Sequence, residues 1–261
     1  MYTYVSGYGK EEISVWKGRT ITGVAIGIIK EGSFWHARIP GDVANATTYN
    51  FPVYFKEMEA TNLQQLLTTE PDPAFVKEVI KAGKELEQLG CRAIVGCCGL
   101  FANYLPEIAA GLNVPCFLTS LMQIPIISHA LKPSQKVGII CGDSRGLSPV
   151  ALKNCGVDSP STVVIVGLEN MPEMHNLLDV HDGITGTGHW NPGKFEQEIV
   201  SLAKQTVSKH PDIGAIVLEC SNLPPFAWAI QEAVRLPVFD FTTLINWAYS
   251  AVVRRPFVGY I

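Results

Sequence analysis

The sequence predicts an α/β protein made of two similar halves, each with a mainly parallel sheet. Short β-branched runs alternate with longer helical stretches, the strand-like runs are apolar almost throughout, and one strand-helix-strand unit occurs twice. Near-continuous apolar runs are typical of strands that are buried on both faces of a parallel sheet. Because ligands bind beyond the carboxyl ends of such strands, we expect the functional residues there.

The expected elements follow one another in a regular strand and helix order. The candidate strands are short, mainly apolar runs at 22–29, 93–96, 114–118, 137–141, 163–167, 215–218 and 238–241. The candidate helices lie between them, at 73–89, 104–112, 192–209 and 225–234. In the first helix, Phe75, Val79, Ala82 and Leu86 recur at helical spacing, so one face is apolar. Strand and helix alternation of this kind predicts right-handed crossovers.

An internal duplication is the most informative feature of the chain. Residues 93–117 match 215–239 without gaps at a constant offset of 122, with seven identities among the 25 positions. Each copy is predicted to form a strand, a turn, a helix and a Pro that leads into the next strand. A weaker match relates 26–29 to 137–140 at an offset of 111. We therefore expect a first half at 1–131 and a second half at 132–241.

The seven cysteines are odd in number and mostly lie in or beside apolar runs. Reduced thiols explain this better than a disulfide framework, and the spacings do not match a zinc site. We therefore expect no metal. Buried packing is the expected role of four of them, namely Cys91, Cys116, Cys141 and Cys155. Cys97 is also expected to be buried, because neighbouring side chains of a strand point to opposite faces.

Only Cys98 and Cys220 are matched to each other by the duplication. Each follows a predicted buried strand and precedes a predicted helix, where free backbone N–H groups and the helix dipole favour a thiolate. We therefore expect the pKa of both thiols to be lowered. If the two halves face each other about a pseudo-twofold axis, the two thiols flank one substrate. Such a pair suits proton transfer on opposite faces of a carbon atom without a cofactor.

Several motifs resemble the aspartate/glutamate racemase superfamily, which includes hydantoin and allantoin racemases, maleate isomerase and arylmalonate decarboxylase. The resemblance covers nearly the whole chain and is carried by the segments 39–48, 98–101, 119–121 and 219–225. It implies two flavodoxin-like, three-layer αβα halves with the active site in the cleft between them, and a C-terminal helix, 242–261, that returns to the first half. It also implies that Cys98 and Cys220 are the acid/base thiols and that a homo-oligomer forms.

Candidate substrate-binding residues lie close to these motifs. Gly99, Ser221 and Asn222 follow the two thiols, and the resemblance implies that Ser221 and Asn222 hold a carboxylate. The other candidates are Thr119 and Ser120 at a strand end, Asn45 and Thr47 in a polar loop, Ser144, and His189. The loop at 41–48 has a turn-forming role as an equal alternative. The loop at 179–190 is interpreted either as a lid over the cleft or as a polar surface connection.

Composition limits the other possibilities. The 261 residues are 47% apolar and 17% charged, which provides a core and excludes general disorder. A net charge of −4 lacks the basic excess that nucleic-acid binding needs, and neither a membrane span nor a secretory signal is evident, so a cytoplasmic protein is expected.

The sequence thus predicts a cofactor-independent racemase or epimerase of a small carboxylate, such as an amino acid or a hydantoin-like compound. Gly99 and Leu100 stand where amino-acid racemases of this type usually have Asn-Thr, and Ser221 and Asn222 stand where glutamate racemases have Thr-His. These departures argue against glutamate as the substrate. One alternative is a decarboxylase or a cis-trans isomerase that uses a single Cys. A third hypothesis is a carboxylate-binding protein without turnover.

Overall fold

The computed structural model describes residues 21–32, 36–59, 72–178 and 190–255. Most of the elements expected from the sequence are present, and they form two four-stranded parallel sheets with flanking helices. The first sheet has the order β2-β1-β3-β4 and contains β1 (Ile26–Lys30), β2 (Val53–Glu57), β3 (Ala93–Gly96) and β4 (Cys116–Phe117). The second has the order β6-β5-β7-β8 and contains β5 (Lys136–Cys141), β6 (Val163–Gly167), β7 (Ile213–Leu218) and β8 (Val238–Phe239). The predicted fold class is confirmed.

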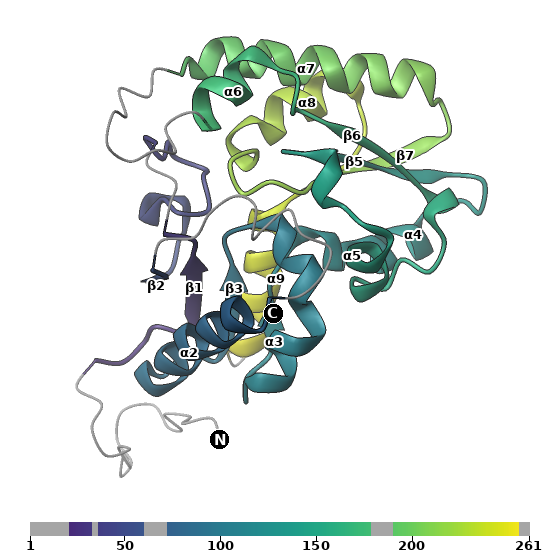
Figure 1. Cartoon of the computed structure of the whole chain (residues 1–261). Coiled ribbons are helices and arrows are strands. Elements are labelled where there is room, and N and C mark those ends of the chain that lie inside the picture. Colours follow the sequence, from purple (N-terminus) through teal and green to yellow (C-terminus); the bar gives the residue numbers. More distant parts are fainter. Residues whose placement is uncertain (1–20, 33–35, 60–71, 179–189, 256–261) are drawn as a thin grey trace, which may run out of the picture.

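Eight α-helices are seen in the described residues and cover these sheets (Figure 1). They are α2 (Pro73–Leu89), α3 (Leu105–Gly111), α4 (Ile124–Ala130), α5 (Pro149–Asn154), α6 (Pro172–Leu178), α7 (Pro192–Lys209), α8 (Ala227–Val234) and α9 (Phe241–Val252). The predicted bounds of α2 and α7 match the structure. In α2 the Asp72 side chain accepts a hydrogen bond from the Ala74 N–H, and Gly90 ends the helix at φ 100°. Such caps fix both ends of the helix.

Sequence analysis missed β2 and the short helices α4, α5 and α6. Strand β2 lies at the sheet edge and is half-exposed or exposed along its length, so it lacks the apolar run of a central strand. The three helices have only six or seven residues, too few to display a helical repeat. The end strands β4 and β8 are shorter than predicted.

The duplication holds in the backbone as well as in the sequence. Strands β4 and β8 occupy the same two positions of the repeat. The Ile94 N–H donates to the Pro115 carbonyl at 3.0 Å, and the equivalent Ile216 N–H donates to the Pro237 carbonyl at 2.9 Å. The same local sequence pattern has therefore folded twice into the same unit.

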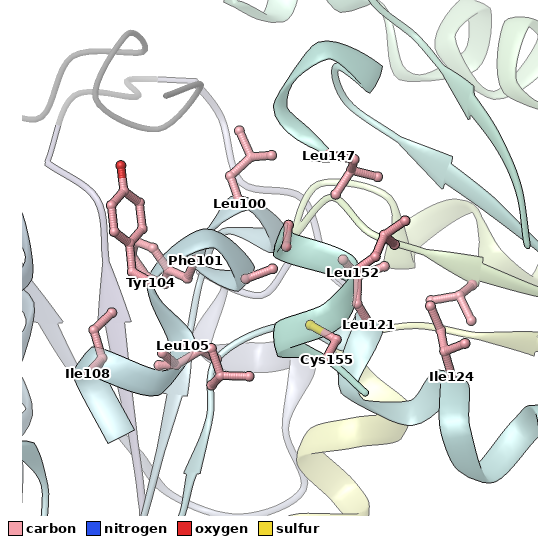
Figure 2. Close-up of a cluster of buried hydrophobic side chains, with 14 of the residues drawn as sticks. Leu100, Phe101, Tyr104, Leu105, Ile108, Leu121, Ile124, Leu147, Leu152 and Cys155 are labelled. Carbon is pink, nitrogen blue, oxygen red and sulfur yellow. The ribbon is translucent and has the colours of Figure 1, made fainter. Parts of the chain in front are cut away.

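An apolar interface joins the two halves (Figure 2). Leu100 and Phe101, in the 3-10 helix Gly99–Tyr104, belong to the same buried cluster as Leu147, Leu152 and Cys155 of the second half. Polar contacts add to it: Asn103 Nδ2 donates to the Gly146 carbonyl at 3.1 Å, and Ser148 Oγ donates to Asn103 Oδ1 at 3.1 Å. This continuous core fixes one sheet relative to the other.

The last helix returns to the first half of the molecule (Figure 1). Phe241 and Ile245 of α9 pack with Ala93, Val95 and Cys97 of the β3 region. Asp240 begins this helix with a capping box, in which its side chain accepts from the Thr243 N–H. The boundary expected between residues 131 and 132 stays a prediction. No helix in the described ranges is long and apolar enough to cross a membrane.

Candidate active site

Cys98 and Cys220 lie at equivalent ends of the two central strands. Cys98 follows β3, and Cys220 lies two residues beyond the end of β7. The carbonyl of Cys98 accepts a hydrogen bond from the Phe101 N–H at 3.2 Å, and the carbonyl of Cys220 accepts one from the Leu223 N–H at 3.1 Å. Both thiols are free and half-buried. The predicted equivalence of their positions is therefore present in the backbone.

The two cysteine motifs touch each other. A Cβ added at Gly99 would lie 2.0 Å from Glu219 Oε1 and 2.4 Å from the main-chain oxygen of Glu219. The residue after the first thiol therefore packs against the residue before the second. Ser120 Oγ also donates to the Leu218 carbonyl at 2.7 Å, which links the first half to the end of β7. The Cys220 thiol is near enough to contribute to the raised pKa of Cys98.

The expectation that both thiols have a lowered pKa is wrong for this structure. Burial raises the pKa of Cys98 well above its usual range, and Glu31, Glu219 and Cys220 raise it further. Burial and then Glu219 likewise raise the pKa of Cys220. The N–H groups of Leu100 and Asn222 do oppose this, each by a hydrogen bond to one thiol. Their effect is smaller than the cost of placing a thiolate beside buried carboxyl groups.

Two buried carboxyl groups flank the thiols. Glu31 follows β1 and Glu219 follows β7, and they are only 4% and 2% exposed. Burial raises the pKa of each from 4.5 to about 7. Glu219 Oε2 accepts a hydrogen bond from the Gly142 N–H at 3.3 Å, and Arg38 Nη2 lies 3.6 Å from Glu31 Oε1. Near pH 7 the site therefore contains two carboxyl groups that exchange protons readily.

Arg38 brings positive charge to the segment after Cys220. Its Nη1 donates to Asn222 Oδ1 at 2.7 Å and also lies 3.4 Å from Asp42 Oδ2. His36 Nε2 is 3.3 Å from the same Asn222 oxygen. The predicted carboxylate-binding residue Asn222 is thus oriented by a buried cation from the first half.

The loop at 39–48 packs against this segment from the first half. The Val43 N–H donates to the Ser221 carbonyl at 3.3 Å. Gly41, at φ 99°, allows close approach, because a Cβ there would lie 2.9 Å from Pro225 Cα. The loop therefore adjoins the candidate site.

The other predicted binding residues have mainly structural partners. Asn45 Oδ1 accepts hydrogen bonds from the Thr47 N–H at 2.9 Å and from Thr47 Oγ1 at 2.7 Å. Thr119 is buried and caps the short helix Ser120–Gln123, while Ser144 Oγ donates to Glu169. Ser221 is buried and hydrogen-bonds the thiol of Cys97, which is fully buried as predicted. Their contact with substrate stays a prediction, and His189 lies outside the described residues.

Several solved structures share the architecture of this chain. Unliganded arylmalonate decarboxylase matches 91% of this chain and 96% of its own, with a TM-score of 0.53 at 15% identity. An aspartate racemase homologue from Pyrococcus horikoshii OT3 matches 86% of this chain and 98% of its own, with a TM-score of 0.50 at 19% identity. The chain therefore shares its fold with arylmalonate decarboxylase and with this racemase homologue. The resemblance inferred from the sequence motifs is thereby confirmed at the level of the fold.

Among curated proteins, the similar sequences are named as lyases, whereas the two solved structures above are named as a decarboxylase and an aspartate racemase homologue. A dimethylsulfoniopropionate lyase from Durusdinium sp. clade D is 26% identical over 251 residues, which cover 93% of this chain and 80% of the relative. Dimethylsulfoniopropionate lyase 7 from Emiliania huxleyi is 28% identical over 227 residues, which cover 84% of this chain and 64% of the relative. No family model matches the chain. The comparisons support an enzyme with an Asp/Glu racemase fold, while the isomerase class stays a prediction.

Sequence analysis did not select Glu31, Arg38 or Glu219 as site residues. Both glutamates directly follow central strands, which is the position where this type of sheet binds ligands. That rule, applied to every strand end, would have found them. Arg38 gave no comparable signal, because its role depends on contacts with Glu31, Asp42 and Asn222. The described residues contain no group of three or more His, Cys, Asp or Glu placed to hold a metal ion.

Proposed function

We propose that this protein is a cofactor-independent lyase that removes a proton next to a carboxylate and expels a sulfonium group from the adjacent carbon. The observation that carries the proposal is the meeting of two equivalent thiols with buried carboxyl groups where the two halves touch. The named relatives supply the reaction and point to dimethylsulfoniopropionate as the substrate to test.

The proposed elimination needs one base and a good leaving group. A thiolate takes a proton from the carbon next to the carboxylate, and the C–H electron pair forms the new C=C bond. The C–S bond breaks at the neighbouring carbon, and its electron pair stays on sulfur. The products are acrylate and neutral dimethyl sulfide, and the proton remains on the thiol. The electrons of this step balance without an oxidant or a metal ion.

A cationic substrate would offset the high pKa of the resting thiols. In the ligand-free protein, burial and nearby carboxyl groups keep both thiols protonated. A positive sulfonium group beside a thiol favours its thiolate form and so lowers its pKa. The N–H groups of Leu100 and Asn222 are already in place to stabilise the thiolate. The base is therefore activated mainly when the correct substrate is bound.

The substrate carboxylate needs hydrogen-bond donors, because the negative charge of the reacting carbon spreads onto it. Ser221 and Asn222 are the proposed donors, and Arg38 contributes positive charge beside Asn222. These residues lie directly after Cys220 and next to the loop at 39–48. This arrangement would place the acidic carbon close to the thiols.

Racemisation or epimerisation is the second candidate function. It is favoured by the equivalent backbone positions of Cys98 and Cys220, since inversion needs one group on each face of the reacting carbon. Elimination needs only one base. The two functions therefore differ in whether both thiols are required.

The purified chain should be incubated with dimethylsulfoniopropionate, with release of dimethyl sulfide followed in the headspace and acrylate by chromatography. We expect equal amounts of both products and none from a Cys98→Ser/Cys220→Ser double variant. In parallel, aspartate, glutamate and hydantoins should be incubated in D₂O and checked for deuterium at the stereogenic carbon. Deuterium incorporation without dimethyl sulfide would replace the lyase by a racemase. The absence of both would contradict catalysis by this site.

A further inference from the structure

Glu31 is a buried carboxyl group with one oxygen left unsatisfied. Its side chain is 5% exposed. Oε1 faces Arg38 Nη2 at 3.6 Å, whereas Oε2 has no hydrogen-bond partner within the part of the chain that the structure describes. A buried carboxylate oxygen without a partner is costly. This atom is therefore free to accept a positively charged ligand group.

The Glu31 carboxyl group acts on the thiols. After burial, it makes the largest contribution to the raised pKa of both Cys97 and Cys98, and it also raises the pKa of Cys220. The strand pairing agrees with this, because Ile29 lies opposite Gly96 and its carbonyl accepts a hydrogen bond from the Cys97 N–H at 2.9 Å, so the segments of Glu31 and Cys98 leave the sheet side by side. A ligand charge held at Glu31 would thus lie close to the proposed base.

Among the described residues, the cations near Glu31 are shared with other acidic groups. Arg38 is shared among Glu31, Asp42 and Asn222. Asp42 has a further donor, the Ala44 N–H at 2.7 Å. The Lys30 amino group donates to Glu57 Oε1 at 2.8 Å and to the main-chain carbonyl of Glu31 at 2.7 Å. Negative charge is therefore in excess here when the carboxyl groups are ionised, which favours a cation.

We propose that the Glu31 carboxylate binds the positively charged onium group of the substrate and selects a cationic carboxylate over a neutral one of the same shape. This inference rests on the proposed function, because it assigns the substrate class of that same site. The ligand would be a short carboxylate that carries a sulfonium or an ammonium group. Ser221 and Asn222 would receive the other, negative end of the molecule.

The role predicts a characteristic kinetic effect. The substrate carries its full positive charge when it binds, and this charge disappears as the C–S bond breaks. Glu31 consequently stabilises bound substrate at least as well as the transition state. Loss of its charge should raise KM by about tenfold or more and change kcat much less. A purely structural role would instead reduce the fraction of active enzyme and leave KM unchanged.

A pair of isosteric ligands tests the proposal independently of turnover. Dimethylsulfoniopropionate and 4-methylpentanoate have the same shape. At the branch point, the first has a positively charged sulfur atom and the second has a CH group. Their dissociation constants should be measured by calorimetry on the Cys98→Ser/Cys220→Ser variant, with and without Glu31→Gln. With Glu31 present, we expect the dissociation constant of dimethylsulfoniopropionate to be about tenfold lower than that of 4-methylpentanoate. Glu31→Gln should abolish this difference and leave the dissociation constant of 4-methylpentanoate unchanged. The dissociation constant of β-alanine, which carries an ammonium group, shows whether the site prefers a sulfonium or an ammonium group.

The matched control is Glu173→Gln, another buried glutamate, on α6, whose carboxylate accepts from the Asn191 N–H at 2.7 Å. It should leave the preference for the cation unchanged. An equal affinity for the two isosteres, or an equal loss of both in Glu31→Gln, would overturn the proposal. If a cation preference is present but no dimethyl sulfide forms, the onium site stands and the lyase reaction fails.

The Glu219→Gln variant, which leaves Glu31 as the carboxyl group of the site with a pKa of about 7, provides a second measurement if Glu31→Gln does not fold. Affinity for the cation should rise as the pH passes through about 7, where Glu31 ionises, while affinity for 4-methylpentanoate does not rise. The charged and titratable groups that act on Glu31 are Lys30, Arg38 and Asp42, and it acts in turn on Cys97, Cys98 and Cys220. A cation affinity that is independent of pH from 6 to 8 would contradict the role of Glu31.

Discussion

The backbone follows the same pattern after β3 as after β7, but the side chains at the two strand ends differ. Cys98 is preceded by the buried thiol of Cys97, whereas Cys220 is preceded by the buried carboxyl group of Glu219. The main electrostatic neighbour of Cys98 is Glu31, and that of Cys220 is Glu219. Duplication therefore placed two thiols at equivalent positions, and later differences in side chains made them unequal. Unequal thiols suit an elimination with one base better than a symmetrical exchange of roles.

Replacing each thiol tests this inequality most directly. We predict that Cys98→Ser lowers kcat for dimethyl sulfide release by about 10²- to 10⁴-fold, the usual contribution of a general base. Cys220→Ser should cost less, because a cation held at Glu31 activates Cys98 more strongly. Cys116→Ser is the control, since this half-buried thiol lies on β4 away from the two motifs. Equal losses in both variants would instead support two equivalent bases.

The contact between the two motifs should be sensitive to a single methyl group. In Gly99→Ala the new Cβ would meet the carboxyl and main-chain oxygens of Glu219, and the main-chain oxygen cannot move without shifting β7. We expect a loss of about 3 kcal/mol in the free energy of unfolding, measured with urea, together with lower activity. Gly193→Ala, where the nearest atom is 3.4 Å away, should leave both unchanged. A stable and fully active Gly99→Ala variant would rule out this close approach.

Glu219 makes stability depend on pH. Its carboxyl group titrates near 4.5 in the unfolded chain and near 7 in the folded protein. Between these values the folded state holds a proton that the unfolded state has lost, so unfolding becomes easier as the pH rises. Glu219→Gln removes this titration and should stabilise the protein by about 2 kcal/mol more at pH 8 than at pH 5.

Asp143 provides the opposite case within the same half. Hydrogen bonds from Arg145 hold the pKa of Asp143 below its usual range. Its contribution to stability is present above the unfolded pKa and is lost as the pH falls. Asp143→Asn should therefore destabilise the protein less at pH 3 than at pH 6 in urea unfolding. If Glu219→Gln showed this same trend, the assignment of Glu219 as a buried, proton-holding group would be wrong.

The smallest expected effect concerns the hydroxyl group that joins the halves. Ser120→Ala removes the hydrogen bond to the Leu218 carbonyl. We expect a loss of about 1 kcal/mol in the free energy of unfolding, because a buried hydrogen bond is replaced by an apolar contact. Ser201→Ala, at an exposed position on α7, should have almost no effect. A loss of activity in Ser120→Ala without a loss of stability would favour the alternative prediction that Ser120 contacts substrate.

The sequence determined the elements that carry their own pattern. Apolar, β-branched runs predicted the central strands, and an apolar stripe at helical spacing predicted α2. Gap-free duplication predicted that Cys98 and Cys220 are equivalent, since the same local pattern folds in the same way. Short helices such as α5 carry too few residues for a periodic pattern, so only their packing against the core reveals them.

Tertiary structure decided how the site behaves. The helix-terminus argument predicted a lowered thiol pKa, but burial and neighbouring carboxyl groups reverse the direction. Both effects come from residues far apart in the chain: the segments of Glu31 and Cys98 meet when β1 pairs with β3, and Glu219 meets Gly99 only when the two halves pack. The chain alone thus determined where the thiols lie along their strands. Which charges surround them was decided by packing, because electrostatic interactions depend on distance in space and on the exclusion of water.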